Sequence, residues 1–361
     1  MDDGVSNVRS LSALVAQELL IWLESSLISL KRGHRAFAAS IHAHEQAGVD
    51  HRKSGFSAVS DLRILVIGGT RYIGPRVVRR LAAAGHTVTV FHRGQHAAAF
   101  PDGVETVTDP NAAIPITSYP KKLFHFEPQI VLHMIAMGER DGAAARNAFA
   151  SIASRIVMLS SGDVYRAYGC FSKVETGPIE PTPLTEQSKL RSIMYPYRAS
   201  STPGDSLEYF YDKILAEREV SSDPRLAATI LRLPKVYGPG DNADLATVYG
   251  FRNHPNWRWT HGFVENVAAA IALAVVDERA KGRIYNLGEA STPSVSERLN
   301  FLPPRPDAPI FDKDANFDQD VAYDTRLIRY ELGYEEPIPE RQAMISTVSE
   351  YLESRTGSGS G

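Results

Sequence analysis

The segment from Ile64 to Val78, ILVIGGTRYIGPRVV, constrains the fold of this chain more than any other. Its first residues form an apolar run typical of a buried strand, and its last residues begin the apolar spacing of a helix. Between them lies a glycine-rich turn, in which Gly68 and Gly74 permit a sharp bend and a close approach of the backbone to a ligand. The amides at the start of such a helix bind phosphate groups. This order of strand, turn and helix predicts a dinucleotide-binding unit.

The end of the second predicted strand indicates which dinucleotide fits the turn. In such folds this position usually carries an acidic residue that bonds the ribose 2′-hydroxyl and repels a 2′-phosphate. This chain has His92 and Arg93 there, and Arg71 lies in the turn itself. Guanidinium groups bind phosphate well, so the sequence favours NADP(H) over NAD. The predicted cofactor contacts in the two segments are Gly68, Thr70, Arg71, Tyr72, Ile73, Gly74, His92 and Arg93.

From Leu62 onward, short apolar runs alternate with helical stretches, a pattern typical of βαβ units. Further strands are expected where such runs recur, at residues 87–91, 129–134, 155–160, 229–234 and 284–288. The sequence therefore predicts an α/β fold with a Rossmann-like, doubly wound parallel sheet, whose ligands bind at the carboxyl ends of the strands. We expect the Rossmann domain at residues 61–240 and a smaller substrate-binding part at 241–354.

The two ends of the chain lie outside this pattern. Residues 11–30 are mostly apolar, with leucines at three- and four-residue steps, but they include two glutamates. Ionised groups are costly in lipid, so we expect residues 1–60 to form a helical extension that docks or supports a homodimer, without a membrane span. Residues 355–361 are typical of a flexible tail.

Composition narrows the classes of function. The chain has 361 residues and a formal net charge of -3, which gives no electrostatic drive toward nucleic acid or anionic membranes. The single cysteine, Cys170, excludes an internal disulfide and a cysteine-based zinc site, and it agrees with a cytoplasmic location. No group of histidine and acidic residues has metal-ligand spacing. We therefore expect a cytoplasmic protein with a small-molecule substrate and no metal.

The segment YFYDK, from Tyr209 to Lys213, places a tyrosine and a lysine four residues apart. On a helix this spacing brings both side chains onto one face. A phenol is a poor base at neutral pH unless a nearby cation, such as this lysine, stabilises the phenolate. Upstream, Ser160 and Ser161 end a predicted strand, where a serine can hydrogen-bond the reacting oxygen. These residue types predict acid-base chemistry at a hydroxyl or carbonyl group.

Over roughly residues 62–352, these motifs resemble the NAD-dependent epimerase/dehydratase family of extended or atypical short-chain dehydrogenase/reductases. Gly68 and Gly74 match the glycines of its first turn, and Arg71 replaces the middle one, as in atypical members. The family's serine lies four residues before a tyrosine, which selects Ser161. Its YxxxK pair matches Tyr209 and Lys213.

The resemblance implies a separate role for each of the predicted catalytic residues, Ser161, Tyr209 and Lys213. Tyr209 would act as general base and acid on a substrate hydroxyl, Ser161 would hold the same oxygen, and Lys213 would lower the tyrosine pKa and bind the nicotinamide ribose. The resemblance also places further residues beside the cofactor, namely Ala136, Pro234 and Val236. The implied function is that of an NAD(P)-dependent epimerase, dehydratase or reductase, acting on a sugar nucleotide or a related hydroxyl or carbonyl compound.

A second class of function stays open at this point, a non-catalytic NAD(P)-sensing or RNA-associated protein, because atypical members with a GGTR-type turn include RNA-binding ones. The intact predicted catalytic residues and the absence of a basic stripe favour the enzyme. The short segment between Tyr237 and Trp257, where sugar-nucleotide enzymes of the family carry an insertion, also leaves room for a different substrate or for a pocket that no longer functions.

Two further polar residues are interpreted as structural, and one tyrosine is set aside on its spacing. His133 is expected to be a core histidine with its hydrogen bonds satisfied, and Arg232 is expected to brace its strand. Tyr211 has Leu215 four residues on, so we do not expect it to replace Tyr209 in the tyrosine and lysine pair.

Overall fold

The computed structural model describes residues 61–202, 206–311 and 313–356. From Leu62 onward these residues belong to one compact unit. The predicted N-terminal extension lies outside the described residues, as do the last five residues of the predicted tail. Helix α12 (Glu340–Thr356) includes the first two residues of that predicted tail.

A sheet of seven parallel strands forms the centre of the unit, in the order β3-β2-β1-β4-β5-β6-β9. Its strands are β1 (Arg63–Ile67), β2 (Thr87–His92), β3 (Glu105–Thr108), β4 (Ile130–His133), β5 (Arg155–Ser161), β6 (Ala227–Leu233) and β9 (Ile284–Asn286). After β1 the chain adds β2 and β3 on one side of it. It then adds β4, β5, β6 and β9 on the other side. The order therefore reverses between β1 and β4, where doubly wound folds bind their ligands. The predicted Rossmann-like fold is confirmed.

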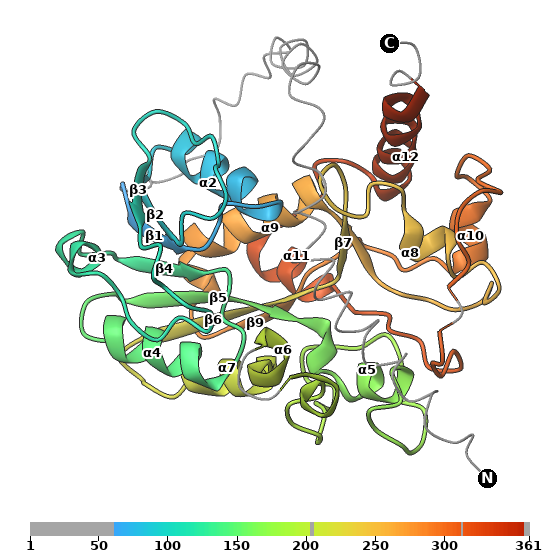
Figure 1. Cartoon of the computed structure of the whole chain (residues 1–361), viewed down its shortest axis with the longest axis horizontal. Coiled ribbons are helices and arrows are strands. Elements are labelled where there is room, and N and C mark those ends of the chain that lie inside the picture. Colours follow the sequence, from blue (N-terminus) through green and yellow to red (C-terminus); the bar gives the residue numbers. More distant parts are fainter. Residues whose placement is uncertain (1–60, 203–205, 312, 357–361) are drawn as a thin grey trace. The chain divides into compact units, whose positions relative to one another are not determined.

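Alternate residues of each strand face opposite sides of this sheet, and helices cover both sides (Figure 1). In β1, Ile64 and Val66 pack in a cluster with α2 (Ile73–Ala83) and α9 (Val264–Val276). Leu65 and Ile67 pack in a second cluster on the other side. The helices of that second side are α3 (Lys121–His125), α4 (Glu139–Phe149) and α7 (Lys213–Val220). Burial on both sides explains why these strands are continuously apolar.

A third cluster, rich in aromatic residues, lies beyond the sheet. The ring of Trp257 stacks on Phe171 with centroids 4.6 Å apart and meets Phe251 edge-on at 5.0 Å. The smaller elements of the chain are α5 (Arg166–Phe171), α6 (Leu207–Phe210), β7 (Lys235–Tyr237), α8 (Ala246–Tyr249), β8 (His261–Phe263), α10 (Val295–Leu299), α11 (Arg326–Leu332) and the 3-10 helices Gly162–Val164, Arg198–Ser200 and Glu278–Ala280.

The predicted domain boundary at residue 240 does not divide the structure. Strand β9 pairs with β6 in the main sheet, and α9 packs on α2, although both elements lie after residue 240. Residues 264–286 therefore bring the chain back to the main sheet after it has left it. Within the described residues, every helix is too short or too polar to serve as a membrane span.

Candidate functional site

The glycine-rich turn at the end of β1 has a backbone that only glycine adopts easily. Gly68 and Gly69 have φ angles of 92° and 83°. The Gly68 amide donates to the Phe91 carbonyl at 2.8 Å, which ties the turn to β2. A Cβ on Gly74 would lie 2.3 Å from the Cα of Gly69. The two ends of the turn therefore touch through their backbones, as a turn that admits a pyrophosphate requires.

Helix α2 begins immediately after this turn and fits an anionic ligand. No side chain caps its N-terminus and no acidic residue lies in its first turn, within the described part of the chain. Tyr72, just before the helix, has a φ of 48°, which a bulky residue rarely adopts. Its hydroxyl donates to the Asp241 carbonyl at 3.2 Å, so the loop after β7 holds the turn in place. Of the other predicted contacts, Thr70 is half-buried in the turn, whereas the Ile73 side chain packs in the core.

Three basic side chains in or near the turn influence one another's pKa. Burial, and secondarily the charge of Arg93, lowers the pKa of Arg71, while Asp241 opposes the shift. Burial followed by the charges of Arg71 and Arg93 lowers the pKa of His96. This arrangement of Arg71, Arg93 and His96 is called the cationic cluster below. Sequence reasoning missed His96, because it lies in an irregular loop.

His92 contacts protein groups through both of its ring nitrogens. Its Nδ1 accepts a hydrogen bond from the Gly94 amide at 3.0 Å, and its Nε2 faces the Thr108 hydroxyl at 3.5 Å. Burial lowers its pKa. The ring thus shapes the bend that follows β2, and Arg93 is the residue of this pair that belongs to the cationic cluster.

Two serines end β5, and their contacts distinguish them. The hydroxyl of Ser160 donates to the buried carboxylate of Glu217 at 2.5 Å. Ser161 is half-buried and caps the 3-10 helix that follows, its hydroxyl accepting from the Asp163 amide at 3.3 Å. The Ser160 hydroxyl is therefore bonded inside the protein, whereas Ser161 lies half-buried at the edge of the sheet, where a ligand could contact it.

Lys213 brings a cation to the carboxyl ends of β4 and β5. Its Nζ donates to the carbonyl of Ala136 at 2.6 Å and to that of Leu159 at 3.1 Å. Burial lowers its pKa to about 8, opposed by the carboxylates of Asp141, Asp163 and Glu217. Ala136 is fully buried under this contact. Pro234 and Val236 are also buried, at the end of β6 and in β7.

Tyr209 and Lys213 do not share a helix, contrary to the prediction. Helix α6 ends at Phe210 and α7 begins at Lys213. The ring of Tyr209 is half-buried, meets Phe210 edge-on and lies 4.7 Å from the guanidinium of Arg198. Because the helix is interrupted, the four-residue spacing no longer aligns the two side chains.

Tyr211 lies between α6 and α7 and is buried. Ser161 and Asp163 lie near enough to its phenol to influence the phenol's pKa. The Nζ of Lys213 lies 5.8 Å from the centroid of its ring. Burial and Asp163 raise the pKa of Tyr211 well above its usual value. The spacing argument that set Tyr211 aside assumed a continuous helix, and the helix is interrupted here.

The two polar residues interpreted as structural differ in outcome. Arg232 braces the interior, as predicted, because its guanidinium bonds both oxygens of Glu217, at 3.1 and 2.8 Å, and the Tyr165 hydroxyl at 3.1 Å. His133 is fully buried, but neither ring nitrogen has a hydrogen-bond partner among the described residues. Burial lowers its pKa to about 3. The expectation that its hydrogen bonds are satisfied is therefore wrong.

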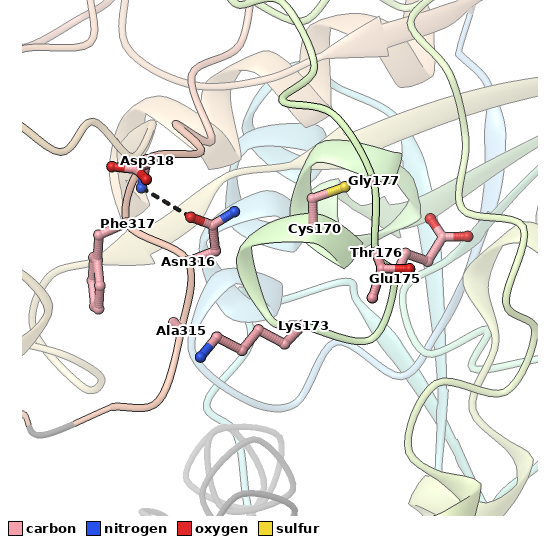
Figure 2. A pocket seen from close by; sticks show the side chains of 9 residues that line it. All are labelled: Cys170, Lys173, Glu175, Thr176, Gly177, Ala315, Asn316, Phe317 and Asp318. Atoms are coloured by element: carbon pink, nitrogen blue, oxygen red, sulfur yellow. Dashed lines mark hydrogen bonds between the residues drawn. The ribbon is translucent and has the colours of Figure 1, made fainter.

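A cavity of about 620 Å³ lies apart from these residues, beyond the end of α5 (Figure 2). Lys173 and Thr176 line one side of it, and Asn316 and Asp318 line the other. None of the residues predicted to bind cofactor or substrate lines it. The described residues include no group of three potential metal ligands.

The doubly wound parallel sheet and the glycine turn at the end of β1 define a protein of the Rossmann class. The sequence also matches the model of the NAD dependent epimerase/dehydratase family over residues 64–288, and the chain belongs to this family of NAD-dependent enzymes.

One curated relative is the 2'-dehydrokanamycin reductase of Streptomyces kanamyceticus, which is 28% identical over 249 residues. The match covers 63% of this chain and 61% of that protein, so the chain spans less than two thirds of the relative's length.

Solved structures share the fold at low sequence identity. A UDP-glucose 4-epimerase of Thermotoga maritima has a TM-score of 0.60 and 17% identity, covering 81% of this chain and 100% of its own. An NAD-dependent NDP-hexosamine 5,6-dehydratase involved in tunicamycin biosynthesis has a TM-score of 0.58 and 20% identity, covering 82% of this chain and 99% of its own.

Proposed function

We propose that this chain is an NADP(H)-dependent oxidoreductase that transfers a hydride between the nicotinamide and a carbon bearing a hydroxyl or carbonyl group. The observation that carries the proposal is the placement of a phosphate-accepting turn, Ser161 and Lys213 at one edge of one sheet. The dinucleotide and the reacting oxygen would then lie side by side, which is the positioning that hydride transfer requires.

The substrate class that the proposal favours is a carbohydrate with a ring carbonyl or hydroxyl. The relative named above acts, by its name, as a reductase on 2'-dehydrokanamycin. Structures of the same fold were solved with UDP-glucose or named as acting on an NDP-hexosamine. Reduction, epimerisation and dehydration can all begin from one site of this kind, and we favour reduction because the curated relative is a reductase.

The chain's own residues would bind the cofactor, orient the substrate and exchange a proton with it. The amides at the start of α2 would hold the pyrophosphate, and the cationic cluster would hold a 2′-phosphate. The bound nicotinamide supplies or accepts the hydride. Ser161 would hold the substrate oxygen, and Lys213 would donate to the ribose and favour a phenolate nearby. A tyrosine of the segment from Tyr209 to Lys213 would exchange the proton.

The preference for NADP(H) can be tested by titrating the protein with NADPH and NADH and following the fluorescence of the bound cofactor. We expect NADPH to bind more tightly. Hydrogen bonds to a charged group contribute about 1.5–3 kcal/mol, so Arg93→Ala should weaken NADPH binding by roughly tenfold to a hundredfold and leave NADH binding nearly unchanged. Arg71→Ala should have the same effect.

Arg63→Ala is the matched control, because Arg63 is an exposed arginine at the opposite end of β1. Its removal should change neither affinity. Tighter binding of NADH than of NADPH, or equal losses for both cofactors in the Arg93 variant, would contradict the proposed role of the cationic cluster. The absence of binding by either cofactor would count against the oxidoreductase altogether.

A further inference from the structure

We infer that Arg76 is a positioning residue for the dinucleotide, because it holds the Tyr72 carbonyl and thereby points the Ile73 amide at the pyrophosphate. This inference rests on the proposed function, in which the glycine-rich turn receives that pyrophosphate. It gives a role in cofactor binding to a side chain of α2 that need not touch the ligand. The loop of residues 238–241, called the supporting loop below, is the second part of the arrangement.

The guanidinium group of Arg76 bonds three separate parts of the chain. Its Nη1 donates to the Tyr72 carbonyl at 2.7 Å, at the end of the glycine-rich turn. Its Nη2 donates to the Pro239 carbonyl at 3.2 Å, in the supporting loop. Its Nε donates to the Glu265 carboxylate at 2.7 Å, on α9. The Arg76 side chain is only 16% exposed, so these three partners largely enclose it.

Tyr72 has a backbone conformation that its surroundings must hold. Its φ and ψ angles are 48° and -97°, a combination that a bulky side chain avoids because of steric crowding with the backbone. Such a conformation persists only where neighbouring groups fix it. The Tyr72 hydroxyl donates to the Asp241 carbonyl at 3.2 Å, and a Cβ on Gly240 would lie 3.3 Å from the Tyr72 ring. The supporting loop therefore holds the side chain of Tyr72, and Arg76 holds its carbonyl.

The supporting loop is itself fixed by its own backbone. The Gly238 amide donates to the Asp241 carbonyl at 3.1 Å, and the Asp241 amide donates back to the Gly238 carbonyl at 3.2 Å. Gly238 has a φ of 143°, which glycine adopts more easily than other residues. The carbonyls of Pro239 and Asp241 accept the two side-chain bonds that reach this loop from α2 and from the turn. The loop is thus a firm support for the turn.

Holding the Tyr72 carbonyl also orients the amide of the next residue. In a trans peptide the atoms are coplanar, and the N–H points opposite to the C=O. The bond from Arg76 to the Tyr72 carbonyl therefore directs the Ile73 N–H out of the N-terminal end of α2. The first amides of a helix have no partner within the helix and are the donors that bind phosphate groups. Without Arg76 the strained Tyr72 can relax, and this donor turns away from the pyrophosphate.

The first test compares Arg76→Met with Arg80→Met in fluorescence titrations with NADPH and NADH. A turn that is free to relax spends little time in its binding conformation, so Arg76→Met should bind both cofactors about ten- to a hundredfold more weakly. An equal loss separates this role from that of the cationic cluster, whose variants should affect NADPH alone. Arg80 also bonds Glu265, at 3.2 Å, but lies one helical turn farther from the glycine-rich turn. Arg80→Met should therefore leave both affinities unchanged.

Arg76→Lys separates the geometry of the guanidinium from its charge. Lysine keeps the positive charge but lacks the planar fork, so it cannot hold the Tyr72 carbonyl, the supporting loop and Glu265 together. We expect Arg76→Lys to bind both cofactors nearly as weakly as Arg76→Met. Thermal unfolding of the three variants checks that each one keeps its fold.

A second measurement follows the Ile73 amide by nuclear magnetic resonance and needs no substrate. The protein is labelled with ¹⁵N-isoleucine, and the Ile73 resonance is identified by its loss in Ile73→Val. We expect Arg76→Met to shift this resonance in the free protein and to reduce its response to NADP+. Arg80→Met should leave both as they are in the original protein.

The inference is overturned if Arg76→Met binds both cofactors as tightly as the original protein, or if Arg80→Met loses as much affinity as Arg76→Met. Full affinity in Arg76→Lys, or an unchanged Ile73 resonance in Arg76→Met, would overturn it as well. If the original protein binds neither cofactor, the proposed function itself is contradicted, which keeps the two failures distinct.

Discussion

Replacing Gly74 with alanine is expected to abolish saturable NADPH binding. The added Cβ would lie 2.3 to 2.4 Å from the Cα, carbonyl carbon and carbonyl oxygen of Gly69, and these backbone atoms cannot rotate away as a flexible side chain could. The turn must open, which moves the start of α2 away from the pyrophosphate. Overpacking of this kind also costs about 1–3 kcal/mol of stability, measurable by urea or thermal unfolding.

Gly103→Ala provides the matched control for this substitution. Gly103 has a φ of 85° but nothing within 4 Å of a Cβ built on it, so the variant has backbone strain without a clash. It should lose a little stability and bind NADPH normally. If Gly74→Ala bound NADPH as tightly as the original protein, the assignment of the turn to the pyrophosphate would be untenable.

Replacing Arg232 with methionine is expected to destabilise the fold by about 3–5 kcal/mol, because it leaves a buried charge without its partner. Glu217 accepts two hydrogen bonds from Arg232 and one from Ser160, and all three side chains are buried. Without the guanidinium, the Glu217 carboxylate would have to be protonated or to draw water into the interior. The loss is measured as the free energy of unfolding in urea.

A double variant separates the buried charge from the packing of the site. In Arg232→Met with Glu217→Leu no unpaired carboxylate remains, and replacing a whole buried ion pair by apolar residues is often neutral. Most of the stability should therefore return. A single Arg232→Met variant as stable as the original protein, or a double variant less stable than the single one, would contradict this account of the interior.

Local sequence patterns predict most of this fold. The strands β1, β2, β4, β5, β6 and β9 coincide with apolar runs, because a parallel sheet covered on both sides needs apolar side chains on both faces. Strand β3 was not predicted, since Glu105, Thr106 and Thr108 give it a mostly polar edge. The glycine turn was predictable because its conformation depends on residues within a few positions of one another.

The candidate site depends on contacts between residues far apart in the sequence, and local sequence patterns predict such contacts less well. A four-residue spacing predicts two side chains on one face only if the helix continues between them. Here the helix does not continue, because the Asp212 side chain caps α7 and the Asp212 amide donates to the carbonyl of Met137, in the loop after β4. His133 likewise could be predicted as buried from its apolar neighbours, but its lack of hydrogen-bond partners among the described residues could not.

The central claim, hydride transfer at the carboxyl edge of the sheet, is tested most directly by following the hydride itself. The protein is incubated with NADPH carrying deuterium at the nicotinamide C4 and with a panel of oxidised aminoglycosides and keto sugar nucleotides, and the products are examined by mass spectrometry. The account predicts that at least one substrate becomes an alcohol with deuterium on the reduced carbon. Oxidation of NADPH without deuterium in any product, or no consumption of NADPH across the panel despite tight binding, would contradict it.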